Sequence, residues 1–143
     1  MTGSESVFTV WASGCSHVIA DHKNGRESLG DAIRQSEGTS EDGAPPFEWD
    51  ICLNLGDFSA AFGLPTEEEG REIVRQFRAL SMHPREAFYT ICGNHDRNAP
   101  DEEPGIWFRK WIDPMGESSD VSGVHCERYP YPVNGTWERY WFD

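Results

Sequence analysis

Short apolar runs alternate with amphipathic stretches along the first two thirds of the chain. The apolar runs at 7–13, 47–57 and 87–92 are rich in β-branched and aromatic residues, and a glycine closes each of them, which is typical of strands. Between them, residues 25–38 and 66–83 place hydrophobic side chains at the spacing of a helix with one buried face. The pattern therefore predicts the order β-α-β-α-β.

The second of these helices carries the most distinct signals. Thr66 followed three positions later by Glu69 has the sequence of a capping box, which satisfies backbone N–H groups at a helix start. Ile73, Phe77 and Leu80 then follow at i, i+4 and i+7, so they share one face.

Both connections between the expected strands are long enough to contain a helix. Such connections join parallel strands by right-handed crossovers, so the expected fold class is α/β. In sheets of this kind, ligands bind outside the carboxyl ends of the strands. The polar residues at the three strand ends are therefore the first candidates for chemistry.

The rest of the chain differs in character. Residues 97–136 contain several prolines and glycines, and we expect a loop-rich excursion that packs by its aromatic residues, with one helical candidate at 104–113. Trp107 and Trp111 are expected to pack on the sheet, while the excursion as a whole lines a cleft. Residues 136–143 alternate in the manner of a strand that the end of the chain interrupts.

Composition narrows the function classes. The chain of 143 residues is expected to be the N-terminal part of a single domain (1–143). Its net charge of −13 disfavours nonspecific nucleic-acid binding and attracts divalent cations. No apolar run reaches the roughly 18 residues of a membrane span, and no signal peptide is visible. Four cysteines without C-x-x-C spacing favour a reducing, cytoplasmic location.

Candidate chemistry lies directly after each expected strand. The three polar clusters are Cys15-Ser16-His17, Gly56-Asp57 and Gly93-Asn94-His95-Asp96. In this order, and with LGD at 55–57 and GNHD at 93–96, the sequence resembles the calcineurin-like metallophosphoesterases. That family's pattern is D-x-H, G-D and G-N-H-D/E, each after a strand.

The resemblance implies the β-α-β-α-β start of an αββα sandwich and a phosphatase-type hydrolase acting on a phosphate-ester substrate. It implies two divalent metal ions (manganese, iron, zinc or similar), with metal-bound hydroxide as the nucleophile. Asp57 would bridge the ions, Asn94 would bind one of them and His17 the other. His95 would be the general acid, and Asp96 would orient its imidazole and keep it protonated.

Two departures from the family pattern affect these expectations. Cys15 stands where the family has an aspartate: its thiolate could bind a softer ion such as zinc or iron, Ser16 or Asp21 could take the position, or the first metal site could be weakened. The family's later histidine motifs are missing, because after residue 96 the chain has only His125, expected to be an exposed loop residue. Activity would then require histidine motifs from beyond residue 143.

Two other function classes compete with the hydrolase. A catalytically impaired module that binds or regulates is supported by Cys15 alone, and the intact GNHD argues against it. A nucleotide-binding doubly wound domain would need G-x-G-x-x-G after the first strand, and the sequence lacks it.

Overall fold

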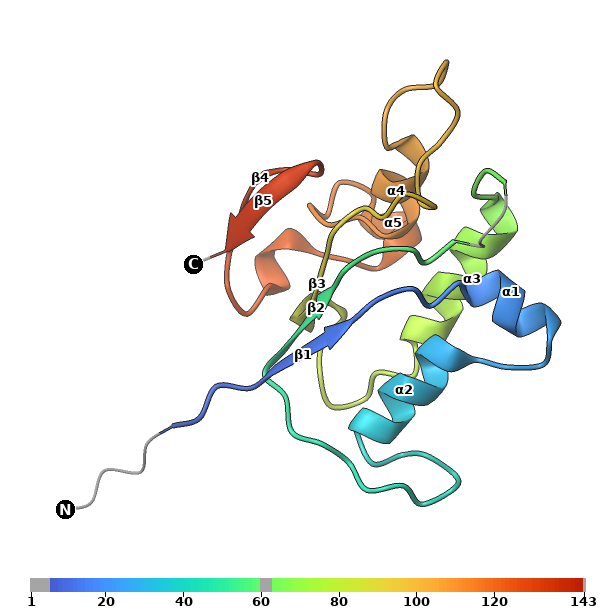
Figure 1. Ribbon diagram of the computed structural model, residues 1–143. Helices are drawn as coiled ribbons and strands as arrows, with labels where there is room; N and C mark the ends of the chain where they lie inside the picture. Colours follow the sequence, from blue (N-terminus) through green and yellow to red (C-terminus); the bar gives the residue numbers. More distant parts are fainter. Residues whose placement is uncertain (1–5, 60–62, 143) are drawn as a thin grey trace.

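A computed structural model describes residues 6–59 and 63–142 of the chain (Figure 1). The strands are β1 (Val10–Ser13), β2 (Ile51–Asn54), β3 (Phe88–Thr90), β4 (Val133–Thr136) and β5 (Arg139–Phe142). The α-helices are α1 (Val18–Lys23), α2 (Ser28–Ser36), α3 (Glu67–Phe77), α4 (Ile106–Trp111) and α5 (Ser119–Ser122). Two short 3₁₀ helices are η1 (Arg85–Ala87) and η2 (Cys126–Arg128).

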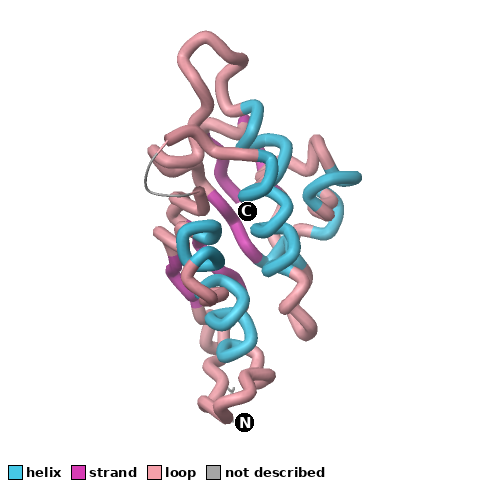
Figure 2. Tube along the Cα trace, turned by 90° about the vertical axis from the view of Figure 1, so that its right-hand side faces the viewer, coloured by secondary structure: helices cyan, strands magenta, loops and turns pink. Residues whose placement is uncertain are grey.

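The central sheet is parallel, with the strand order β1-β2-β3. Helices α1, α2 and α3 lie on one side of it, and the antiparallel hairpin β4-β5 lies on the other (Figures 1 and 2). This arrangement confirms the expected α/β class. It also brings the carboxyl ends of all three parallel strands to one edge of the sheet.

The two faces of the sheet bury different side chains because neighbouring residues of a strand point to opposite sides. On the helical side, Cys52 and Phe88 join a core with Ile33, Ile73 and Phe77 from α2 and α3. On the other side, residues of β2 and β3 contact aromatic residues of the hairpin. Both faces of β3 are therefore covered.

Helix α3 begins as the sequence predicts. The Thr66 side chain accepts the Glu69 N–H, and the Glu69 carboxylate accepts the Thr66 N–H at 2.7 Å, so both halves of the capping box form. The helix buries Ile73 and Phe77 as expected.

Helix α4 lies within the expected helical segment 104–113, but its tryptophans pack on helix α3 and not on the sheet as expected. Trp107 and Trp111 are buried against α3 and its N-terminal end. The Trp107 indole N–H donates to the Thr66 carbonyl at 2.8 Å, and the Trp111 indole N–H donates to Glu67 at 3.2 Å. These two side chains hold the excursion to the helical layer.

The strands are shorter than the apolar runs that predict them. The parallel register of β1 with β2 covers only Val10 to Ser13, and beyond Ser13 the two chains continue as loops. The expected single strand over 136–143 is wrong in its first part. Thr136 ends β4, residues 137–138 form the turn, and β5 begins at Arg139.

Helix α1 has no counterpart in the sequence prediction, because six residues are too few to show a helical period. Among residues 6–59 and 63–142, no helix is long and apolar enough to cross a membrane.

Candidate metal centre

The loops after β1 and β2 run side by side beyond the end of the sheet. The Cys15 N–H donates to the Gly56 carbonyl at 2.9 Å, and the His17 N–H donates to the Asp57 carbonyl at 3.1 Å. One ligand atom from each of Cys15, His17 and Asp57 lies within 4.8 Å of the others. The structure therefore brings together three of the four metal ligands expected from the sequence.

The His17 ring is oriented by the backbone. Its Nδ1 lies 2.6 Å from the Ser59 carbonyl oxygen. A carbonyl only accepts hydrogen bonds, so Nδ1 carries the proton and the lone pair of the neutral ring is on Nε2. Metal-binding histidines typically have this arrangement, with the second nitrogen donating to a carbonyl or carboxylate. His17 is thus held in the tautomer that a cation requires.

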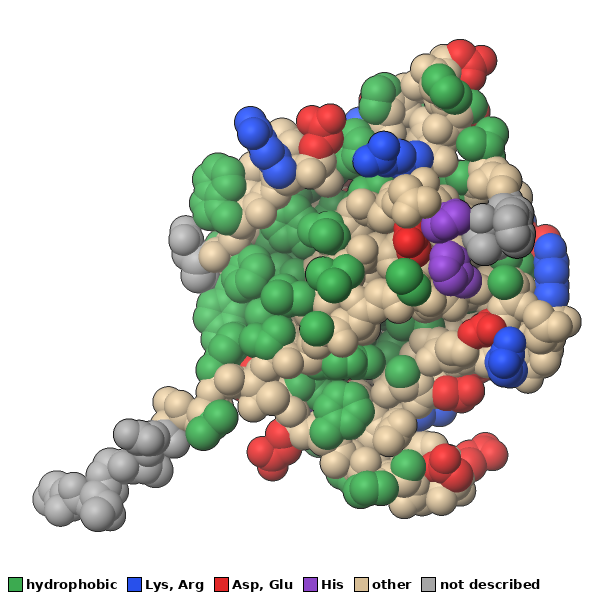
Figure 3. Space-filling view, in the orientation of Figure 1, with side chains coloured by type: hydrophobic (Ala, Val, Ile, Leu, Met, Phe, Trp, Pro, Cys, Tyr) green, Lys and Arg blue, Asp and Glu red, His purple; other side chains and the backbone are tan. Residues whose placement is uncertain are grey.

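Asp57 connects the first and third clusters. Its Oδ1 accepts the His95 N–H at 3.0 Å, and its Oδ2 lies 3.8 Å from the Cys15 sulfur. The His95 ring meets the His17 ring edge to face, with centroids 5.2 Å apart. Figure 3 shows two histidine side chains side by side at the surface, next to an acidic side chain.

Glycines allow the second and third strand ends to approach this closely. A Cβ on Gly93 would lie 2.1 Å from Asp57 Oδ1 and 2.3 Å from the Asp57 nitrogen. A Cβ on Gly56 would lie 2.3 Å from the Gly93 nitrogen. Both distances are far below van der Waals contact, so the glycines of LGD and GNHD are steric requirements of this backbone approach.

The candidate ligands occupy an unusual backbone conformation. Cys15, His17 and Asp57 have φ values of 53°, 39° and 58°, in the left-handed region that non-glycine residues seldom adopt. Among the described residues, Asp113 is the only other non-glycine residue with positive φ. Such strain of about 1–3 kcal/mol per residue persists where the surrounding structure enforces it, and it clusters at functional sites.

Asp96 has a different role from the one expected. It is fully buried, and its carboxylate accepts backbone N–H groups from both sides of the site. Oδ1 accepts those of Phe58 and Ser59 at 2.9 and 3.0 Å, and Oδ2 accepts those of Asp57 and Gly93 at 2.8 and 3.0 Å. Burial raises the pKa of Asp96, and the backbone N–H groups oppose that rise.

All of these hydrogen bonds bind Asp96 to main chain, and no hydrogen bond within the described residues joins it to the His95 imidazole. The expectation that Asp96 orients His95 is therefore corrected: Asp96 ties the GNHD loop to the loop that carries Asp57. The positions of Gly93 and Asp57 depend on it.

The remaining candidates divide between the site and its surroundings. Asn94 is exposed and lies between Gly93 and His95, both of which contact Asp57. Asp21, an alternative to Cys15, belongs to α1 and pairs with Arg26 at 3.1 Å. Cys15 itself occupies the position in the cluster. His125 lies outside the cluster and is half-buried, not exposed as expected.

Asn54 and Ser59 also shape the site, and sequence reasoning did not identify them. Asn54 is buried at the end of β2, where its amide donates to the Ser13 hydroxyl at 3.0 Å and accepts the Gly56 N–H at 2.9 Å. The signal for Asn54 was a polar residue within an apolar run, since a buried amide needs partners. Ser59 acts through its backbone carbonyl, which no side-chain motif reveals.

The donor set fits one cation of borderline softness. Thiolate, imidazole and carboxylate together favour zinc or iron over magnesium. The only other group of such side chains among the described residues is His22, Glu27 and Glu72. Its two carboxylates are already paired with Arg34 or Arg75, so their charge is largely compensated.

Comparison with known proteins adds no relative to this picture. No family model matches the chain, and neither a curated protein nor a solved structure matches it.

Proposed function

We propose that this chain carries the metal-binding part of a metal-dependent hydrolase of phosphate esters, of the calcineurin-like type. The observation that carries the proposal is the convergence of Cys15, His17 and Asp57 within 4.8 Å at the carboxyl ends of adjacent parallel strands. His95 beside them adds a group that can transfer a proton. The proposal explains why strained backbone and obligatory glycines occur at the same edge of the sheet.

Each residue has a distinct task in this proposal. His17 Nε2, the Cys15 thiolate and the Asp57 carboxylate hold a divalent cation, and the exposed Asn94 amide can add an oxygen ligand. The cation, when bound, supplies a Lewis acid that activates water and neutralises phosphoryl charge. The His95 imidazole protonates the leaving oxygen of the ester. The backbone N–H of His95 donates to Asp57 Oδ1 and so fixes the residue beside the cluster.

A centre with two cations would need more ligands than a centre with one. Asp57 would be the carboxylate shared by two cations. Its Oδ1 accepts the His95 backbone N–H of the GNHD loop, and its Oδ2 lies toward Cys15. A second cation would need additional nitrogen or oxygen ligands beyond those that converge within the described residues. We therefore propose one firmly held cation, and a second that depends on further ligands.

The test combines metal content with hydrolysis. The chain of 143 residues is loaded with zinc, iron or manganese, and its metal content and its hydrolysis of an aryl phosphate are measured. Asp57→Asn should reduce both metal content and rate, because it removes the shared charge. His95→Asn should keep the metal and lower the rate by roughly 10²–10⁴-fold, the usual contribution of a general acid.

Matched controls are the exposed Asp101 and the half-buried His125, which lie outside the site. Asp101→Asn and His125→Asn should behave as the wild type does. Metal binding without any hydrolysis would contradict a hydrolase that works with the residues of this chain alone, and would favour the binding module. If Asp57→Asn binds as much metal as the wild type, the proposed centre is wrong.

A further inference from the structure

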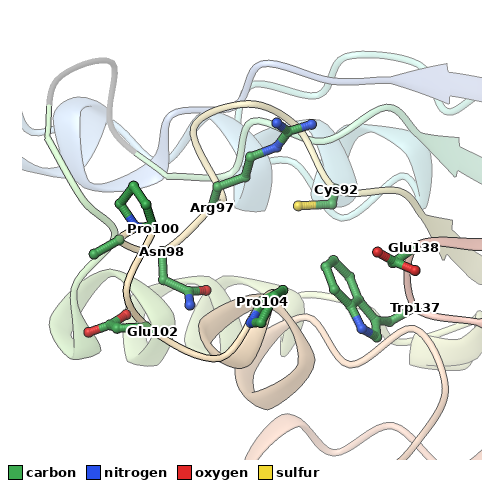
Figure 4. A pocket seen from close by; sticks show the side chains of 10 residues that line it. Cys92, Arg97, Asn98, Pro100, Glu102, Pro104, Trp137 and Glu138 are labelled. Carbon is green, nitrogen blue, oxygen red and sulfur yellow. The ribbon is translucent and has the colours of Figure 1, made fainter.

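A pocket of about 400 Å³ opens between the segment that follows GNHD and the β4-β5 turn (Figure 4). Its walls are formed by the segment 97–105 and by Cys92, Trp137 and Glu138. Cys92 directly precedes Gly93, whose backbone lies against Asp57. Two of its lining residues, Cys92 and Arg97, therefore directly flank the GNHD sequence of the candidate metal centre.

Arg97 is the cationic side chain among the residues that line this pocket. It is exposed, and it forms no ion pair with any carboxylate of the described residues, although the chain carries a net charge of −13. It follows His95 by two positions and shares one pocket wall with Cys92 (Figure 4). A guanidinium in this place matches the oxygens of a phosphate in a forked, two-bond geometry.

Trp137 provides a flat apolar wall. Its six-membered ring lies so close to Gly105 that a Cβ there would be 2.5 Å from the ring. The ring also meets Phe108 at a centroid distance of 6.4 Å. Trp137 is half-buried, so packing fixes one part of the indole and the rest lines the pocket. A fixed indole is a stacking surface for a planar ring.

The other polar side chains of the pocket offer acceptor oxygens. Glu102 and Glu138 are exposed carboxylates on its walls, and Glu102 lies at the far end from the Arg97 guanidinium in Figure 4. The Asn98 amide donates to the Glu103 carbonyl at 2.5 Å, while its buried oxygen has no hydrogen-bond partner. These acceptor oxygens favour a ligand that brings N–H or O–H groups.

We propose that this pocket binds the organic part of the phosphate ester, and that the substrate class is a phosphate ester of a planar heterocycle with hydrogen-bond donors, such as a nucleotide. The heterocycle stacks on Trp137, its N–H and sugar O–H groups face Glu102, Glu138 and Asn98, and Arg97 holds the phosphate toward the metal centre. This proposal rests on the proposed function in one respect: the phosphate points toward the metal centre only if that centre acts on phosphate esters. The aromatic subsite itself does not require hydrolysis.

Direct binding tests the pocket without relying on catalysis. Isothermal titration of the metal-free chain with adenosine monophosphate, adenosine and ribose 5-phosphate separates the contributions of ring and phosphate. We expect adenosine monophosphate to bind more tightly than adenosine, and ribose 5-phosphate to bind most weakly. Trp137→Leu should weaken adenosine binding about 10-fold, the order expected for losing one stacking contact.

Arg97→Gln should weaken the binding of adenosine monophosphate and leave the binding of adenosine unchanged. Because Arg97 is exposed, we expect this variant to fold, so it tests the pocket even if Trp137→Leu fails to fold. The matched controls are Trp141→Leu and Arg139→Gln on the same hairpin, both exposed and outside the pocket. Both should bind as the wild type does.

Each outcome bears on one proposal or the other. Nucleotide binding that depends on Trp137 but comes without hydrolysis would support the pocket and contradict the proposed function. Hydrolysis of aryl phosphate that is equal in wild type and Trp137→Leu, without measurable binding of adenosine monophosphate, would overturn the pocket and leave the proposed function standing.

Discussion

Replacing Asp96 with asparagine distinguishes two possible roles for the carboxylate of GNHD, orienting His95 or tying together two loops of the main chain. In the structure, the carboxylate accepts backbone N–H groups from Asp57, Phe58, Ser59 and Gly93 at 2.8–3.0 Å. An amide of the same shape keeps one acceptor oxygen and turns the other into an NH₂ group. Two buried N–H donors would then face another donor.

The expected cost follows from those two lost acceptors. A buried donor left without a partner costs about 1–3 kcal/mol, so Asp96→Asn should lower the free energy of unfolding by roughly 2–6 kcal/mol. A domain of this size has about 5–15 kcal/mol in total, so a loss of this order is a large fraction of its stability. Metal binding should weaken in parallel, because the Asp57 loop loses its tie to Gly93.

Urea unfolding, followed by tryptophan fluorescence and far-ultraviolet circular dichroism, measures the change. The control is Asp101→Asn, an exposed carboxylate in the following loop, which should stay within about 0.5 kcal/mol of the wild type. If Asp96 instead orients His95, its replacement would lower activity and spare stability. An Asp96→Asn variant as stable as the wild type would therefore refute the role assigned here.

Two further predictions concern Gly93 in the GNHD loop and Glu37 at the C-terminal end of α2. Gly93→Ala should destabilise the chain by about 1–3 kcal/mol and reduce metal content, since its Cβ would lie 2.1 Å from Asp57 Oδ1; unchanged metal content would contradict the close approach. Burial raises the pKa of Glu37, but hydrogen bonds led by that of the Ser81 hydroxyl outweigh it and lower the pKa to about 2. The stabilisation from Glu37 should be complete above pH 4.5 and disappear as the pH falls toward 2, and unfolding measured across that range should show a flatter profile for Glu37→Gln.

The order of the first three strands was predictable because hydrophobic periodicity is a local property. The runs around Ile51 and Phe88 are apolar enough to be buried on both faces, as strands in a parallel sheet are. The capping box at Thr66 and Glu69 was equally predictable, because all its hydrogen bonds lie within one helical turn. Where the strands stop was not predictable, since a strand's length depends on its partner's register.

The candidate site divides in the same way. Parallel strands bring their carboxyl ends together, so the convergence of His17, Asp57 and GNHD could be expected from the order of the elements. The role of Asp96 could not, because its partners at residues 57–59 lie 37–39 positions away along the chain. The adjacency of His95 and Asp96 in sequence suggested a pair that the fold does not form.

The sequence by itself determined the α/β class, the helix start at Thr66 and the identity of the polar groups at the strand ends. Only the tertiary structure decided the tautomer of His17, the hydrogen bonds by which Asp96 joins two loops, and the pocket beside Trp137. The physical reason is the sequence separation over which each interaction acts. Side-chain periodicity and capping act within a few residues, whereas these three features depend on backbone groups that approach only when distant segments pack together.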